Sequence, residues 1–203
     1  MTRSAEPLTA EEVRALIKSS STRGPSGIRN RALIAVLWRG GLRIGEALAL
    51  YPRDLDRDAG TVRVRHGKGD KTRLVCIDAE ALAHLDRWLD WRARLGVGAR
   101  APVFCTIATG TTRRAGEALD ASYVRQLLPR LARRAGIDKR VHAHGLRHTH
   151  ALDLVTAGAT ITDIRDQLGH ANVATTDAYL RRVAPADRIK RLRALGWDLE
   201  PVA

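Results

Sequence analysis

Six side chains, spread over four short stretches of the sequence, have the chemistry to break a phosphodiester bond without a metal ion. A tyrosine hydroxyl can attack phosphorus, while histidine and lysine can move protons. Arginine can neutralise the negative charge that develops on phosphate oxygens. The six are Arg43, Lys68, His144, Arg147, His170 and Tyr179. Together they point to phosphoryl-transfer chemistry.

Taken singly, these residues have ordinary structural explanations. Arg43 and Glu46 have the i,i+3 spacing of an ion pair on a helix surface. Lys68 is compatible with a solvated turn, and His170 with a helix C-terminus, where the dipole favours a cation. Tyr179 is compatible with a half-buried side chain whose hydroxyl faces water. The combination therefore carries the functional interpretation, rather than any single position.

The charge balance favours a polyanionic partner. The 203 residues include 35 Lys and Arg against 22 Asp and Glu, a formal net charge of +13, and most of the basic residues are arginine. A planar guanidinium matches phosphate oxygens better than an ammonium does, so nucleic acid is the partner that the composition favours. A biased genome is the alternative source of so much arginine.

The composition is that of a folded, globular chain, with 44% hydrophobic and 28% charged residues. The longest apolar run, residues 32–38, is far shorter than the roughly 20 residues of a membrane span. The N-terminus also has no apolar signal core. We therefore expect a cytoplasmic protein with no membrane partner. Cys76 and Cys105 lie in apolar, strand-like runs and are expected to be buried free thiols.

Hydrophobic spacing predicts one mainly helical domain with a small antiparallel sheet, an α+β fold. Thr9 and Glu12 have the spacing of a capping box at the start of the first helix, and Asp78 is expected to cap a long helix that packs Trp88 or Leu89 inward. Further helices are predicted over residues 28–39, 43–50, 121–135, 144–157, 162–168, 175–182 and 185–195. Strands are predicted over 61–65 and 73–77, which form a hairpin with a glycine-rich basic tip at Lys68, and over 103–106.

The order and local contexts of the six residues resemble the catalytic domain of the tyrosine recombinases, also called phage integrases. The diagnostic stretches are residues 41–48, 67–73, 144–149 and 168–179, and the resemblance covers nearly the whole chain from Leu8 onward. It implies the DNA breaking-rejoining fold as a single catalytic domain over residues 1–203. It also implies site-specific recombination of double-stranded DNA, with four copies of the protein expected in the DNA synapse.

The resemblance also implies a role for each residue. Tyr179 matches the nucleophile that forms a 3′-phosphotyrosine, and His144 matches the base that takes its proton. Arg43, Arg147 and His170 match donors to the non-bridging phosphate oxygens. Lys68 matches the acid that protonates the departing 5′-oxygen, and Glu46 would orient Arg43. No metal ion, ATP or other cofactor is implied, because the phosphotyrosine ester conserves the energy of the broken bond.

Three other functions are compatible with parts of the sequence. The cluster of histidines at 142, 144, 148 and 150 resembles a metal site, but Arg147 within it would repel a dication and no carboxylate flanks it in a ligand pattern. A type IB topoisomerase would use related residues for the same chemistry. A non-catalytic DNA-binding regulator would need only the positive charge and several helices. His148 is expected to pack within its helix or to support the site, and His142 and His150 have no assigned role.

The chain departs from the family pattern at its start. Most relatives carry a helical core-binding domain before the segment that begins at Leu8, and this sequence has only seven residues there. We therefore expect either a catalytic fragment or a single-domain member. A basic amphipathic tail helix over about 184–203 is expected either to dock on a neighbouring protomer or to pack on its own domain.

Overall fold

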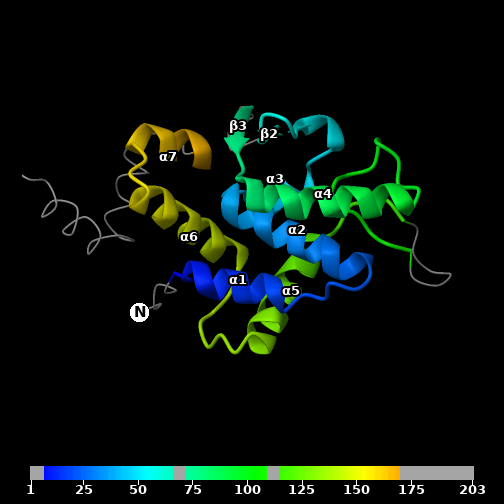
Figure 1. Cartoon of the computed structure of the whole chain (residues 1–203), viewed down its shortest axis with the longest axis horizontal. Helices are drawn as coiled ribbons and strands as arrows, with labels where there is room; N and C mark the ends of the chain where they lie inside the picture. Colours follow the sequence, from blue (N-terminus) through cyan, green and yellow to red (C-terminus); the bar gives the residue numbers. More distant parts are fainter. Residues whose placement is uncertain (1–6, 66–71, 109–114, 170–203) are drawn as a thin grey trace, which may run out of the picture.

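The computed structural model describes residues 7–65, 72–108 and 115–169 (Figure 1). Over these ranges the chain is mainly helical and carries one small antiparallel sheet, which confirms the predicted fold class. The helices are α1 (Ala10–Lys18), α2 (Pro25–Arg39), α3 (Ile44–Leu48), α4 (Ala79–Arg94), α5 (Ala121–Arg134), α6 (Ala143–Thr156) and α7 (Ile161–Leu168), with a 3₁₀ turn over Pro52–Asp54. The strands are β1 (Leu55–Asp56), β2 (Thr61–Val64) and β3 (Arg73–Cys76).

Side-chain caps begin α1 and α4 as the sequence predicts. Thr9 accepts a hydrogen bond from the Glu12 amide at 3.2 Å, and the Glu12 carboxylate accepts one from the Thr9 amide at 2.7 Å, which completes the capping box. Asp78 accepts a hydrogen bond from the Ala81 amide at 2.9 Å at the start of α4. These bonds satisfy backbone N–H groups that have no partner within their helices.

Helix α2 forms the centre of the hydrophobic core. It packs against α1, α3, α4 and α6, and its residues from Gly27 to Trp38 are buried with the sole exception of Arg31. A helix that is covered on nearly every side needs apolar residues all round, and α2 has them from Ala32 to Trp38. It begins three residues before the predicted start because Pro25, with its fixed φ, is well suited to the first turn.

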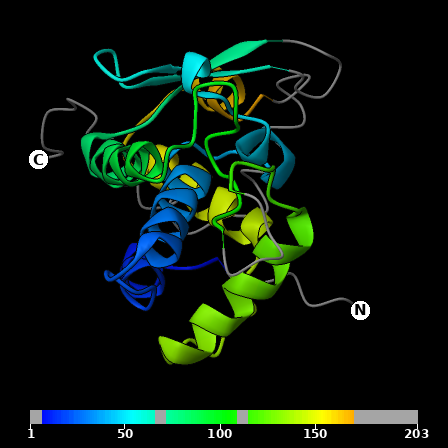
Figure 2. The same ribbon diagram turned by 90° about the vertical axis from the view of Figure 1, so that its right-hand side faces the viewer.

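The three strands pair in the order β1-β2-β3, and both pairings are antiparallel. In the β2–β3 hairpin, Val62 lies opposite Val75 and Val64 lies opposite Arg73. The three valines are buried, so this face of the hairpin points into the domain. Figure 2 shows the sheet at one end of the domain and α5 at the other. The two-residue strand β1 was not predicted from the sequence.

Several local predictions need correction. Residues 103–106 form no strand, and only an isolated bridge joins Cys105 to Ala118. Cys105 is buried as expected, but Cys76 is exposed. The reason is the two-residue period of a strand: Val75 occupies the inward face, so Cys76 must point outward. Helix α3 ends at Leu48 rather than at residue 50.

Two further expectations concern the C-terminal segment and membrane-spanning helices. The helices predicted over 175–182 and 185–195, and the tail over about 184–203, lie outside the described residues. None of the helices within the described ranges is long and apolar enough to cross a membrane.

Arg92 holds the connection between α4 and the next segment. Its side chain is buried, with the residue only 5% exposed. Its guanidinium donates hydrogen bonds at 2.6–3.2 Å to four backbone carbonyl oxygens, those of Val97, Gly98, Ala101 and Pro102. A single cation therefore satisfies the backbone of a loop that has no strand or helix to pair with.

We expect Arg92→Met to lower the free energy of unfolding by about 2–4 kcal/mol, because each buried acceptor left without a donor costs about 1–3 kcal/mol. Chemical denaturation followed by circular dichroism measures this loss. The control is Arg87→Met, an exposed arginine on the same helix, which should change stability by less than about 0.5 kcal/mol. Equal stabilities of the two variants would contradict this account of the loop.

Candidate active site

Arg43 stands at the N-terminus of α3 and is held there by Glu46. The Arg43 amide donates to Glu46 Oε2 at 2.9 Å, and Arg43 Nη1 donates to Glu46 Oε1 at 2.7 Å. The Glu46 side chain is only 6% exposed, whereas that of Arg43 is 36% exposed. The buried carboxylate thus fixes both the backbone and the side chain of an arginine that still reaches solvent. The predicted orienting role of Glu46 requires a contact of this kind, and the role itself stays a prediction.

Arg73 is a second cation on Glu46 that sequence reasoning did not single out. Its Nη1 lies 3.0 Å from Glu46 Oε1 and its Nη2 lies 2.9 Å from Glu46 Oε2, a forked ion pair. The sequence held part of the signal, because Arg73 and Val75 are two residues apart in the predicted strand and must share a face. The structure shows that this face is inward, so the side chain of Arg73 needs an anionic partner there.

The paired cations hold Glu46 in its ionised form. Burial acts to raise the pKa of Glu46, but hydrogen bonds from the Arg73 side chain and the Arg43 amide outweigh it and lower the pKa to about 2. The carboxylate is therefore charged throughout the physiological range.

Arg147 joins the Arg43 segment to the end of α7. The residue lies on α6 and is 3% exposed. Its Nη1 donates to the Gly41 carbonyl oxygen at 2.6 Å, and its Nη2 donates to the Leu168 carbonyl oxygen. Gly41 and Leu168, the first residues of the stretches 41–48 and 168–179, thus meet at one guanidinium group.

Two glycines with positive φ allow these close approaches. Gly41 has φ +59°, and a Cβ there would lie 2.6 Å from Cδ2 of His150. Gly169 ends α7 with φ +64°, and a Cβ there would lie 2.7 Å from Cζ of Arg73. Any other residue would be strained at these angles and would also collide with a buried side chain.

The Gln167 side chain links α7 to the edge of β3 through two hydrogen bonds. Its Oε1 accepts from the Cys76 amide at 3.0 Å, and its Nε2 donates to the Cys76 carbonyl oxygen at 2.7 Å. Within the described ranges no strand pairs with this edge of β3, and the amide side chain takes the place of one. Its Nε2 also lies 3.3 Å from Nε2 of the buried His150.

His144 lies at the start of α6, beside both arginines. Its ring meets that of His148 edge to face, with 4.3 Å between the ring centroids. Desolvation lowers the pKa of His144, and the positive charges of Arg147 and Arg43 lower it further. A neutral imidazole, the form that accepts a proton, is therefore favoured at neutral pH.

The structure assigns positions to the two histidines that had no role. His142 caps α6, because its Nδ1 accepts a hydrogen bond from the Gly145 amide at 3.1 Å. His150 is buried against Gly41, and burial together with the charges of Arg39 and Arg147 lowers its pKa to about 3. Among the described residues, no group of three or more potential ligands could hold a metal ion.

Three of the predicted site residues cannot be placed. Lys68, His170 and Tyr179 lie outside the described residues. The described chain stops next to each segment, at Arg65 and Thr72 around the hairpin tip and at Gly169 after α7. The roles of these three residues therefore stay predictions.

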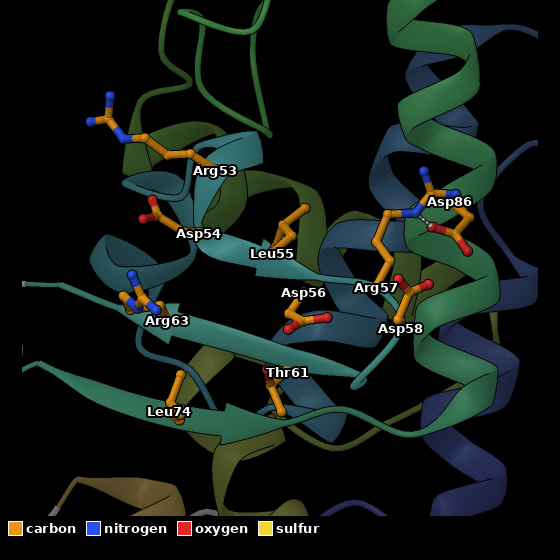
Figure 3. Close-up of a pocket in the computed structure, with 10 residues that line it drawn as sticks. All are labelled: Arg53, Asp54, Leu55, Asp56, Arg57, Asp58, Thr61, Arg63, Leu74 and Asp86. Atoms are coloured by element: carbon orange, nitrogen blue, oxygen red, sulfur yellow. Dashed lines mark ion pairs between the residues drawn. The ribbon is translucent and has the colours of Figure 1, made fainter.

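Two cavities differ in their relation to the site. One, of about 640 Å³, is lined by Ile44 and His144 together with Arg125, Arg133 and Arg140, so it adjoins the site and is rich in positive charge. The other, of about 690 Å³, lies beside the sheet and contains Arg63 and Leu74 in its lining (Figure 3). None of the predicted site residues that the structure describes, namely Arg43, Glu46, His144 and Arg147, lines this second cavity.

Comparisons with known proteins show the family and the fold of this chain. The sequence profile of the phage integrase family matches residues 6–184. Tyrosine recombinase XerC of Xanthomonas axonopodis pv. citri is 38% identical over 172 residues, which is 85% of this chain and 52% of that protein. The crystal structure of XerA recombinase has a TM-score of 0.78 at 29% identity and covers 95% of this chain and 66% of its own.

A further solved structure contains DNA. It is that of XerH site-specific recombinase bound to a palindromic difH substrate, described as a post-cleavage complex. Its TM-score is 0.74 at 27% identity, and the match covers 94% of this chain and 53% of that one.

The chain belongs to the phage integrase family, that of the tyrosine recombinases, as its motifs suggested. It spans about half the length of the curated relative that it matches, at 52%. The activity of a whole protein of this family is therefore a matter for proposal.

The low pKa of Glu46 predicts how the stability of the domain depends on pH. Because the folded-state pKa of about 2 lies below the ordinary value of 4.5, the stabilisation from ionised Glu46 is complete above pH 4.5. It is lost as pH falls toward 2. We expect Glu46→Gln to be less stable than the wild type at pH 7, and the difference should shrink between pH 4.5 and pH 2.

Denaturant titrations at a series of pH values measure this difference. The control is Glu117→Gln, which removes an exposed carboxylate and should give a curve parallel to that of the wild type. A constant difference between Glu46→Gln and the wild type over the whole range would contradict the paired state of Glu46.

Proposed function

We propose that this chain is the catalytic part of a site-specific DNA recombinase, which breaks and rejoins DNA strands through a 3′-phosphotyrosine intermediate. The observation that carries the proposal is the meeting of Arg43, His144 and Arg147 at one place in a member of the tyrosine recombinase family. Tyr179 lies within the matched range, residues 6–184.

In the first step, the hydroxyl oxygen of Tyr179 attacks a backbone phosphorus of DNA. An O–P bond to tyrosine forms as the P–O5′ bond breaks. The phenol proton passes to His144, whose lowered pKa keeps its ring neutral and ready to accept it. An ordinary tyrosine has a pKa of about 10, so a nearby base is needed at neutral pH.

The transition state carries extra negative charge on the non-bridging oxygens. Arg43 and Arg147 are the proposed donors to these oxygens, with His170 as a third. The support for Arg43 is its fixed but partly exposed guanidinium at the start of α3. The support for Arg147 is its contact with Gly41, which places it next to the Arg43 segment.

The departing 5′-oxygen takes a proton from Lys68, which becomes neutral. Rejoining is the reverse: a 5′-hydroxyl attacks the phosphotyrosine, Lys68 takes its proton, and His144 returns one to Tyr179. Since the ester stores the energy of the broken bond, neither ATP nor a metal ion needs to enter this cycle.

The proposed partner is double-stranded DNA, and the proposed assembly is four protomers around two DNA segments. The related XerH is described as bound to its difH DNA substrate. In this chain, the cavity that adjoins His144 is lined by Arg125, Arg133 and Arg140, a charge that suits a phosphate backbone.

We expect Tyr179→Phe to bind DNA with unchanged affinity and to form no covalent adduct, because it lacks only the attacking oxygen. The measurement is incubation with native flanking DNA in EDTA, followed by denaturing electrophoresis and sequencing of the attached strand. The control is Tyr123→Phe, which removes a hydroxyl from α5 and should leave adduct formation intact.

This experiment distinguishes a recombinase from a non-catalytic DNA-binding regulator. An adduct with the wild type that disappears in Tyr179→Phe supports the recombinase. DNA binding by both proteins without any adduct would indicate the non-catalytic regulator instead.

We expect Lys68→Ala to slow cleavage roughly 10²–10⁴-fold, the usual contribution of a general acid. Replacing the bridging 5′-oxygen with sulfur gives a leaving group that departs without a proton. The defect of Lys68→Ala should therefore largely vanish on the sulfur substrate, whereas that of Arg43→Ala should persist on both. Rates of adduct formation on the two substrates measure this, and an equal loss on both for Lys68→Ala would exclude the acid role.

A further inference from the structure

Arg73 occupies an unusual position for a cation in a sheet. It lies on the inward face of β3, at the end of the strand next to the segment that carries Lys68. Its partner across the hairpin is the buried Val64, and its own side chain is only 13% exposed. An arginine buried this far requires an anionic partner inside the domain, because an unpaired charge there would lower the stability of the fold.

The guanidinium of Arg73 lies between Glu46 and the end of α7. Its two Nη nitrogens contact the two oxygens of Glu46, at 3.0 and 2.9 Å. On the other side, its Nε donates to the Gln167 carbonyl oxygen at 3.4 Å, and the backbone of Gly169 lies against Cζ. One side chain thus joins β3 to the Arg43 segment and to the end of α7.

The charges of Arg43, Glu46 and Arg73 explain what the contact between Arg73 and Glu46 does. Glu46 carries one negative charge, and Arg43 and Arg73 carry one positive charge each, so the three together have a net charge of +1. Without Arg73, Glu46 would cancel the charge of Arg43 completely. Because Arg43 is the partly exposed member, the remaining charge faces solvent at the site.

We propose that Arg73 is a positioning residue for strand transfer, which acts on the scissile phosphate through Glu46 and Arg43. It neutralises Glu46, so that Glu46 can hold Arg43 in place without cancelling its charge. This inference rests on the proposed function. Arg73 itself makes no contact with DNA in this mechanism.

The test compares adduct formation at saturating DNA by the wild type and by Arg73→Met. We expect the rate to fall about 10- to 100-fold, less than the roughly 10²–10³-fold lost with a direct donor to the transition state. DNA affinity should be unchanged. Arg73→Lys, which keeps the charge but loses the fork, should be intermediate.

The matched control is Arg63→Met. Arg63 lies on β2 opposite Leu74, on the outward face of the same hairpin, and lines the second cavity (Figure 3). Its replacement removes the same charge from the same sheet, away from Glu46. We expect its rate to stay within about 2-fold of the wild type, as for most surface substitutions.

A double-mutant cycle separates the charge role from simple packing. In a Glu46→Gln background there is no carboxylate to neutralise, so adding Arg73→Met should lower the rate by less than about 3-fold. If Arg73 served only to pack against Gly169, its loss would cost as much in that background as in the wild type. If Arg73→Met alone folds poorly, Arg73→Lys takes its place in the cycle, with the same comparison in the wild-type and Glu46→Gln backgrounds.

The outcomes distinguish the two proposals. If the wild type forms no adduct on native flanking DNA, the proposed function is wrong. If the wild type forms the adduct and Arg73→Met is unimpaired, or is equally impaired with and without Glu46, the recombinase stands and the role of Arg73 is wrong.

Discussion

The site depends on one buried carboxylate. Glu46 is almost inaccessible to solvent, and it accepts hydrogen bonds from the Arg43 amide and from two guanidinium groups. Burying a lone carboxylate costs several kcal/mol, so Glu46 is tolerable only with these donors around it. The donors in turn come from α3 and β3, which are separate in sequence. The need to satisfy Glu46 therefore fixes how the hairpin sits against the start of α3.

Long-range polar contacts also fix the position of the end of α7. Arg147 bridges the carbonyl oxygens of Gly41 and Leu168, and Gln167 pairs with the backbone of Cys76 at the edge of β3. Helix α7 shares with α6 a small apolar cluster that is separate from the main core, so apolar burial alone orients it weakly. Directional hydrogen bonds supply the orientation that packing leaves open.

Much of the fold could be predicted from sequence, because local signals determine it. The capping residues Thr9 and Asp78 and the inward position of Trp88 on α4 were predicted correctly, since each depends on neighbours in the chain. The family motifs identified Arg43, Glu46, His144 and Arg147. Their contacts could not be predicted, because the partners of Glu46 and Arg147 lie 27 and 106 residues away at Arg73 and Gly41. Cys76 was misread because an apolar run does not reveal which strand face is inward.

An arginine pair around a glutamate meets two demands that otherwise conflict. Binding a phosphate transition state requires a positive charge that is both immobile and incompletely neutralised. A carboxylate is the best anchor for a guanidinium, but a one-to-one pair has no net charge left to offer. Adding Arg73 restores one positive charge to the cluster while keeping the anchor, and it does so from a side of Glu46 that is mostly shielded from solvent. Arg73 is also close in sequence to Lys68, the proposed general acid. The chain segment of Lys68 is therefore linked, through Arg73 and Glu46, to Arg43, the proposed donor to the phosphate.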